Sequence, residues 1–214
     1  MRAIIFTISL LIITTLSLAQ NKKQNRLLED GEMIIYGFAK VDAGLSFSTD
    51  NLCIDGTIAG AATLNQTYFL GGFYSGNLNR LPHAIEYEVK AGNNEVQFVT
   101  EDDGDVTFNY GGIYAGYIYS SNFPLHAAAS LQLGWGNAKL YDPFNREVFS
   151  DGIMVIHPQI EGFYRFNSWF KMSVSLGYRF VTGYEPIEGY GLSSSDHNSP
   201  TLRIGFVCGW FDLK

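Results

Sequence analysis

Two short polar segments hold the residue types that hydrolases and calcium-binding proteins use. Ser193-Ser194-Ser195-Asp196-His197 contains the serine, aspartate and histidine of a catalytic triad. Triad members must meet through a defined hydrogen-bonded geometry, which a contiguous polar loop rarely provides. Glu101-Asp102-Asp103-Gly104-Asp105 supplies carboxylate oxygens, which calcium prefers, but it lacks the spacing of an EF-hand. We therefore predict no catalytic residue and no metal site, and we interpret the acidic segment as a solvated hairpin tip.

Cofactor chemistry has no signature elsewhere in the chain. No Walker, Rossmann or zincin motif is present, so we predict no cofactor. The two cysteines, Cys53 and Cys208, are too few for a disulfide scaffold or a thiolate zinc site. Enzymatic activity is therefore not predicted from these residues.

The elements that carry these residues alternate with a period of two, as in β-strands whose successive side chains point to opposite faces. Between Lys171 and Tyr184 the even positions are mostly large and apolar, whereas the odd positions are mostly polar or small. The stretches 125–137 and 201–210 repeat this pattern. The alternation predicts eight strands, approximately at residues 33–47, 51–64, 67–78, 104–120, 123–138, 151–166, 168–184 and 199–212.

The strands and their connections favour a membrane barrel. Most of the predicted strands exceed the roughly 9 to 11 residues that a tilted strand needs to cross a bilayer. Three connections are tight polar corners, at Asn65-Gln66, Ser121-Asn122 and Asn167-Ser168. Three others are long and polar, roughly at residues 81–103, 139–150 and 185–198, whereas the link at 48–50 is short. Outer-membrane barrels typically have short periplasmic turns and long extracellular loops. We predict an all-β fold, an eight-stranded antiparallel up-and-down transmembrane β-barrel in the outer membrane of a Gram-negative bacterium.

Aromatic residues flank the short turns, where we expect them to form a periplasmic girdle, because aromatic rings favour the bilayer interface. The predicted girdle residues are Tyr68, Phe69, Tyr119, Phe123, Phe166, Trp169, Phe170, Trp210 and Phe211. A second set nearer the long loops comprises Phe47, Phe108, Tyr110, Trp135, Tyr178, Phe180 and Tyr184. Alternation alone also fits a soluble barrel, but an apolar outer face would then be an aggregating surface.

The opposite face of the strands, which would line the lumen, carries charged and polar residues. The charged ones are Lys40, Asp42, Asp55, Glu161, Arg179 and Arg203, three positive and three negative. His126, Gln132, His157 and Gln159 extend this lining. Eight strands enclose only enough space for side chains to fill, and buried charges must be paired. We predict a plugged, salt-bridged lumen that serves packing, in preference to a proton or solute path.

Composition and the N-terminal sequence agree with export. Of the 214 residues 46% are hydrophobic and only 16% are charged, and the net charge of -7 offers no basic face for nucleic acid. Met1-Arg2, an apolar run and Ser17-Leu18-Ala19 form a secretory signal with cleavage after Ala19; a retained membrane anchor is the less favoured interpretation. We predict a signal peptide at residues 1–19, a short periplasmic segment at 20–32 and the barrel at 33–214.

Six short segments are distinctive in their order and spacing. They are residues 36–38, 69–76, 110–117, 157–161, 178–183 and 191–196, with the sequences YGF, FLGGFYSG, YGGIYAGY, HPQIE, YRFVTG and GLSSSD. Together they resemble a family of small, largely uncharacterised outer-membrane β-barrel proteins of Bacteroidetes-type bacteria, over most of the mature chain. The resemblance implies an outer-membrane barrel and brings no catalytic residues. The chain departs from it at residues 39–42, where more Gly and Pro is expected, and at its end, where the last aromatic residue stands three positions before Lys214.

Three functions follow from this sequence. We predict a structural or surface-binding, porin-like protein that acts through its extracellular loops, with outer-membrane lipid and the outer-membrane assembly machinery as partners and no nucleic acid. One alternative is an enzyme that modifies outer-membrane lipid, with His126, His157 or His197 as base. Another is a periplasmic barrel that binds an apolar ligand, which requires the apolar side chains to face inward.

Overall fold

The computed structural model describes residues 35–48, 51–65, 67–90, 96–119, 124–142, 144–183 and 193–209, and only the backbone within 83–103. The predicted signal peptide, the segment 20–32 and residues 210–214 lie outside this described part. None of the described residues belongs to a helix that is long and apolar enough to cross a membrane.

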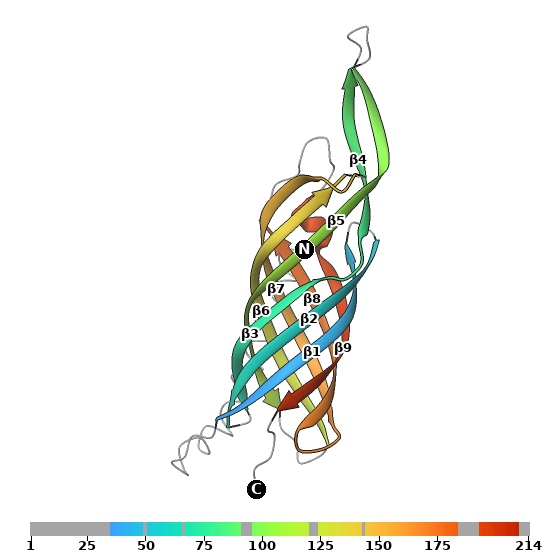
Figure 1. Ribbon diagram of the computed structural model, residues 1–214. Helices are drawn as coiled ribbons and strands as arrows, with labels where there is room; N and C mark the ends of the chain where they lie inside the picture. Colours follow the sequence, from blue (N-terminus) through green and yellow to red (C-terminus); the bar gives the residue numbers. More distant parts are fainter. Residues whose placement is uncertain are drawn as a thin grey trace, which may run out of the picture. The chain divides into compact units, whose positions relative to one another are not determined.

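Antiparallel strands make up almost all of the described chain (Figure 1). They are β1 (Ile35–Ser48), β2 (Asn51–Leu64), β3 (Tyr68–Asn77), β4 (Leu81–Lys90), β5 (Val96–Tyr119), β6 (Leu125–Tyr141), β7 (Glu147–Arg165), β8 (Phe170–Thr182) and β9 (Ser199–Gly209), with a short 3-10 helix, η1 (Ser194–His197), before β9. Eight of the strands close a ring in the order β1-β2-β3-β5-β6-β7-β8-β9, since β9 pairs with β1 and β3 pairs with β5. The predicted eight-stranded antiparallel barrel is confirmed.

The strand outside the ring, β4, corrects the prediction that residues 81–103 form a long polar loop. β4 pairs with the first part of β5, from Leu81 opposite Val106 to Lys90 opposite Val96. Because β6 pairs with β5 only from Asp105 onward, this hairpin continues beyond the closed ring (Figure 1). Its sequence alternates β-branched and aromatic residues with charged ones, and the backbone groups of its two halves bond to each other.

The connection predicted at 139–150 is also shorter than expected. β6 continues to Tyr141 and β7 begins at Glu147, which leaves a turn at 142–146. Asp142 holds this turn, because its Oδ1 accepts hydrogen bonds from the backbone N–H groups of Phe144 (3.0 Å) and Arg146 (2.8 Å). Asn145 has a φ of 61° and Asn65, in the tight turn after β2, has a φ of 49°. Asparagine tolerates this left-handed conformation, which explains its place in both turns.

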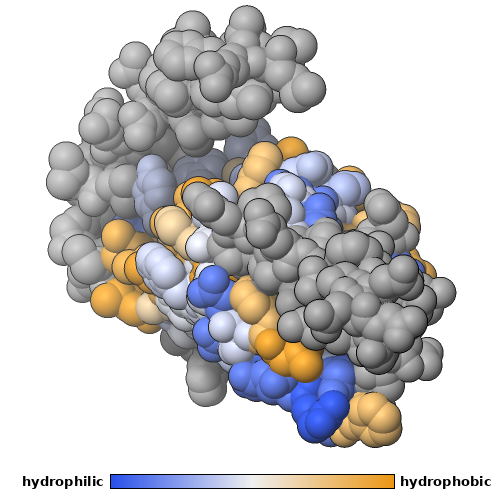
Figure 2. All heavy atoms as spheres, turned by 90° about the horizontal axis from the view of Figure 1, so that it is seen from above, coloured by the Kyte–Doolittle hydropathy of each residue, from blue (hydrophilic) through white to orange (hydrophobic). Residues whose placement is uncertain are grey.

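Burial alternates along each strand, so that the barrel wall has two chemically different faces. In β1 the even positions from Lys40 to Ser48 are buried, whereas the odd positions are exposed. Large apolar side chains dominate the exposed face, among them Ile58 (58% exposed), Ile160 (71%) and Leu176 (62%). Figure 2 looks at the molecule from above and shows hydrophilic and hydrophobic residues side by side in the coloured part. A soluble barrel with an apolar interior would need the opposite arrangement of side chains.

Candidate functional site

The interior near the middle of β1 contains a buried cluster around the ammonium group of Lys40. Lys40 Nζ lies 3.0 Å from Asp42 Oδ2 and 2.5 Å from Glu161 Oε2, and all three side chains are at most 2% exposed. Glu161 Oε1 also accepts hydrogen bonds from Tyr114 OH, at 2.7 Å, and from Ser130 Oγ. One cation and several neutral donors thus compensate two buried carboxylates, as burial of charge requires.

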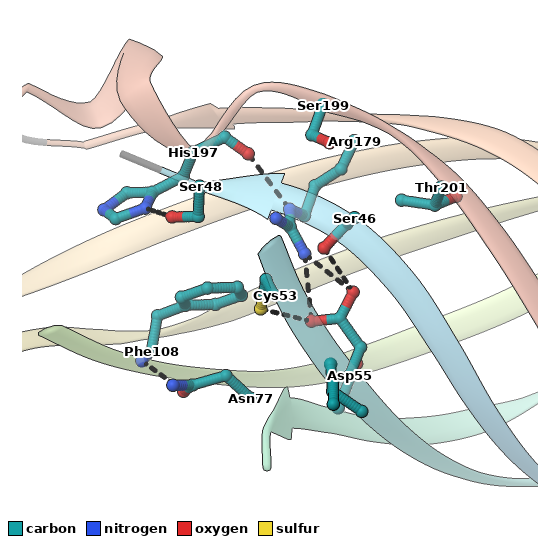
Figure 3. A network of polar contacts seen from close by, with 12 residues as sticks. Ser46, Ser48, Cys53, Asp55, Asn77, Phe108, Arg179, His197, Ser199 and Thr201 are labelled. Atoms are coloured by element: carbon teal, nitrogen blue, oxygen red, sulfur yellow. Dashed lines mark hydrogen bonds and ion pairs between the residues drawn. The ribbon is translucent and has the colours of Figure 1, made fainter. Parts of the chain in front are cut away.

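A second cluster surrounds the carboxylate of Asp55 (Figure 3). Arg179 Nη1 donates to Asp55 Oδ2 at 3.1 Å and to Oδ1 at 3.3 Å. Ser46 Oγ donates to Oδ2 at 2.8 Å and Cys53 Sγ to Oδ1 at 3.2 Å. The carboxylate therefore has donors from three different strands, β1, β2 and β8.

The segment before β9 folds onto this cluster and covers it. Arg179 Nε donates to the backbone oxygen of His197 at 3.1 Å, and its guanidinium carbon lies 4.5 Å from the centre of the Phe108 ring. His197 Nδ1 lies 2.5 Å from Ser48 Oγ, and its ring packs on Phe108 at 5.3 Å. Figure 3 shows Arg179 between His197 and Asp55. The 3-10 helix therefore packs into the interior through the buried His197 side chain and is not a free loop.

The third predicted cation, Arg203, is fully buried and bonds to neutral oxygens. Its guanidinium donates to Gln132 Oε1 and Tyr110 OH at 3.3 Å and to Ser75 Oγ at 3.5 Å. Within the described part of the chain, no carboxylate lies within ion-pair distance of this group. Arg203 therefore joins β9 to three other strands of the ring.

The remaining predicted polar residues also face the interior. His157 Nε2 lies 2.8 Å from Thr201 Oγ1, and His157 and Gln159 are almost completely buried. His126 lies on the inward-facing side of β6 and is half-buried. Among the described residues, no hydrogen-bond partner is found for the Gln159 side-chain amide or for His157 Nδ1. Buried amides of this kind are normally satisfied by ordered water.

The Ser/Asp/His segment does not bring its members together as a triad. Ser193 caps η1, and Asp196 Oδ2 accepts a hydrogen bond from the Ser193 backbone N–H at 2.7 Å, which makes a capping box. His197 points the other way, to Ser48. The serine, the aspartate and the histidine therefore have separate structural contacts.

In the acidic segment, Asp105 forms an ion pair with Arg80 at 2.7 Å, whereas the side chains of Glu101, Asp102 and Asp103 lie outside the described residues. No cluster of three or more His, Cys, Asp or Glu side chains with metal-binding geometry occurs in the described part. Cys53 is buried, Cys208 is exposed, and both are free thiols.

Several residues of the predicted aromatic girdle lie on the outer face. Tyr68, Tyr119 and Phe166 are 39%, 65% and 56% exposed on the outer face, Trp169 is 57% exposed, and Phe170 is half-buried. Phe69 is wrongly placed there, because the alternation turns it inward, where it is 4% exposed and packs on Tyr114 and Phe38. Phe123, Trp210 and Phe211 lie outside the described residues.

Sequence reasoning missed the neutral partners of the interior charges. Phe108 and Tyr110, expected among the outer aromatics, point inward with 1% exposure, and Tyr114 does the same. Hydroxyl groups from Ser46, Ser48, Ser75, Ser130, Ser173 and Thr201 complete the contacts. These residues could have been predicted, because they stand at the alternate positions of each strand that face the interior.

No protein-family model and no curated protein matches this chain. Several solved structures are similar to it. Neisserial surface protein A has a TM-score of 0.54 and 10% sequence identity, over 81% of this chain and 96% of that chain. Ail of Yersinia pestis has a TM-score of 0.49 and 12% identity, over 82% and 98% of the two chains. The outer membrane protein OprG from Pseudomonas aeruginosa has a TM-score of 0.45 and 12% identity, over 84% and 96%. The closed ring of strands, together with the Neisserial match, establishes that the chain has the fold of the small outer-membrane β-barrels.

Proposed function

We propose that the protein is an outer-membrane β-barrel whose lumen is closed to solutes and whose binding surface lies on the hairpin and connections at one rim. The observation that carries the proposal is the division of the wall into an apolar outer face and a charged interior. Hydrocarbon solvates such an outer face, whereas water would drive it to aggregate. The fold agrees with the predicted location in the outer membrane of a Gram-negative bacterium.

The ion pairs support a closed lumen, because they cross the interior. Lys40 on β1 reaches Glu161 on β7, and Asp55 on β2 reaches Arg179 on β8. The partners in each pair stand three places apart in the ring of eight strands. Side chains that meet across so small a barrel leave little room for a solute.

The binding surface in this proposal comprises the hairpin of β4 and β5, the turn at 142–146 and the segment before β9. These connections lie at the same end of the strands. Rim structures of this kind are where outer-membrane barrels present most of their sequence to the outside. Lipid and the assembly machinery are the partners that any such barrel requires, and membership of the Bacteroidetes-type family is part of the same proposal.

Cell fractionation and gel mobility test the proposal. The protein is expected only in the outer-membrane fraction, and its unboiled form is expected to migrate differently from the boiled form, because a closed barrel resists SDS until it is heated. A protein in the soluble periplasmic fraction with no mobility shift would refute the proposal.

We further propose that the barrel is not an enzyme. His157 and His197, two of the predicted bases, are fully buried and bond to Thr201 and Ser48 inside the wall, away from any lipid. The lipid A of a deletion strain should therefore match that of its parent in mass spectra. A changed acyl pattern, restored by the wild-type gene, would support lipid modification instead.

A further inference from the structure

A groove of about 680 Å³ crosses the outer face of the barrel from β9 to β5. Its floor is a row of register partners on neighbouring strands, Ile204, Ala43, Gly56, Gly76 and Asn109. The three central members are small, so the wall is low there, and the Leu78 side chain packs over it at Gly56. The groove therefore follows from the register of the sheet.

Apolar side chains stand on both sides of this floor. On one side, Val41, Ile58 and Tyr74 are 59%, 58% and 53% exposed. On the other side, Leu78 is 70% exposed, and a Cβ on Gly56 would lie 3.1 Å from its Cδ2. The floor is one residue row wide and crosses four strand spacings, or about 19 Å. One leaflet of a bilayer gives an acyl chain about 15 Å, so these dimensions suit a single hydrocarbon chain.

The end of the groove at β5 is polar. Thr107 and Asn109 line it from β5. Their register partners on β6 are Lys139 and Asn137. The Lys139 ammonium lies 2.6 Å from Glu147 Oε2, so a carboxylate holds this cation. The groove thus changes from apolar to polar along its length, and Lys139 lies one strand beyond its polar end.

We propose that the groove binds one acyl chain of a lipid A-type glycolipid, and that Asn109, Asn137 and Lys139 bind its phosphorylated headgroup. The proposal rests on the proposed function, since such a lipid reaches the groove only from a membrane. Lys139 stands two residues before the end of β6 and its 142–146 turn. This turn lies at the same end of the strands as the long hairpin of β4 and β5, which the proposed function places at the outer rim, so the polar end lies in the leaflet that faces outward, where we place this lipid.

The groove is narrow for a second copy of the protein. A neighbouring barrel would present a wall of side chains several rows wide, whereas the floor has one row. The outer residues around the groove also continue into the exposed apolar face, which the proposed function assigns to lipid. An acyl chain is therefore the occupant that fits both the shape and the surroundings.

Native mass spectrometry of the full-length protein in detergent, titrated with purified diphosphorylated lipid A, tests the proposal. Ala43→Phe fills the floor with an apolar side chain that the outer face tolerates. It should weaken binding about tenfold, as expected when roughly two methylene groups lose their contact. Ala129→Phe, at an exposed outer position away from the groove, is the matched control and should bind as the wild type does.

Substitutions of the two ion-paired residues at the polar end, Lys139 and Glu147, should change lipid A binding in opposite directions. Lys139→Gln should weaken lipid A binding, because the headgroup phosphate loses its cation. Glu147→Gln should strengthen binding, because Lys139 loses its competing carboxylate. A retained heat-dependent gel shift in every variant shows that the barrel has folded and keeps this test separate from that of the proposed function.

Equal lipid A binding by Ala43→Phe and Ala129→Phe would overturn the proposal. Equal or tighter binding of phosphatidylglycerol would reject lipid A as the occupant. A dimer that Ala43→Phe dissociates in the absence of lipid would instead identify the groove as an interface between copies of the chain.

Discussion

Replacing Lys40 by methionine should destabilise the barrel strongly. The substitution keeps the length of the side chain but removes the ammonium that lies between Asp42 and Glu161. Two carboxylates with at most 2% exposure would then share the interior without their cation. Tyr114 and Ser130 still donate to Glu161, and Ser173 still donates to Asp42, but neutral donors do not cancel the repulsion between two charges.

The size of the effect follows from the burial of the pair. Removal of one partner from a buried ion pair typically lowers the free energy of unfolding by about 3–5 kcal/mol, because the other charge stays desolvated. The double variant Lys40→Met/Glu161→Gln removes one of the two carboxylate charges as well. Its loss should therefore be smaller than the sum of the two single losses.

Urea unfolding in lipid vesicles, followed by tryptophan fluorescence, measures these free energies. Lys139→Met is the matched control, because Lys139 forms an ion pair with Glu147 whose side chains are 31% and 42% exposed. Exposed pairs contribute little, so this control should unfold close to the wild type. A loss of less than about 1 kcal/mol for Lys40→Met would refute the account, because only an exposed pair costs so little to break.

Three further predictions concern packing and pH. Gly205→Ala should destabilise the barrel by about 1–3 kcal/mol in the same unfolding assay, because its Cβ would overlap the Asp42 carboxylate, whereas Gly152→Ala, with open space around its Cβ, should not; equal losses would contradict the close approach. Phe69→Ala should lower the free energy of unfolding by about 3–5 kcal/mol and Tyr119→Ala by much less, because Phe69 is 4% and Tyr119 65% exposed; the reverse order would return Phe69 to the girdle. The pKa of Asp142 is lowered from the usual 3.8: partial desolvation raises it, but hydrogen bonds from the backbone and side chain of Arg146 outweigh this. The Asp142 carboxylate therefore stabilises the turn above the usual pKa, and this stabilisation is lost as the pH falls through the lowered value. Amide exchange at Arg146, corrected for intrinsic rates, should lose protection in acid, and pH-independent protection would contradict this.

The fold was predictable because the alternation is strong in most of the chain. The runs from Lys171 and from Thr201 hold their large apolar residues mostly at alternate positions, and that face of each strand becomes the outer wall. The hairpin of β4 and β5 was interpreted as a loop although residues 85–90 alternate apolar and charged side chains, because this run is short and the segment around it is rich in charged residues.

The charged residues of the interior were predictable by parity, but their partners were not. Glu161 and Lys40 are 121 positions apart in sequence, and only the ring closure and the register bring them together. Phe69 was misplaced because it follows Tyr68 directly, and neighbouring residues in a strand face opposite ways. Phe108, Tyr110 and Tyr114 of β5 turn inward because they share the inward-facing alternate positions of the strand, and there Phe108 packs against Arg179.

Single-channel recording in planar bilayers tests the closed, ion-paired lumen most directly. Purified and heat-modifiable protein is expected to insert without discrete conductance steps above the baseline, because the Lys40 and Arg179 pairs cross the interior. Reproducible conductance steps that an interior substitution changes would contradict the account, since they require an open aqueous path through the barrel.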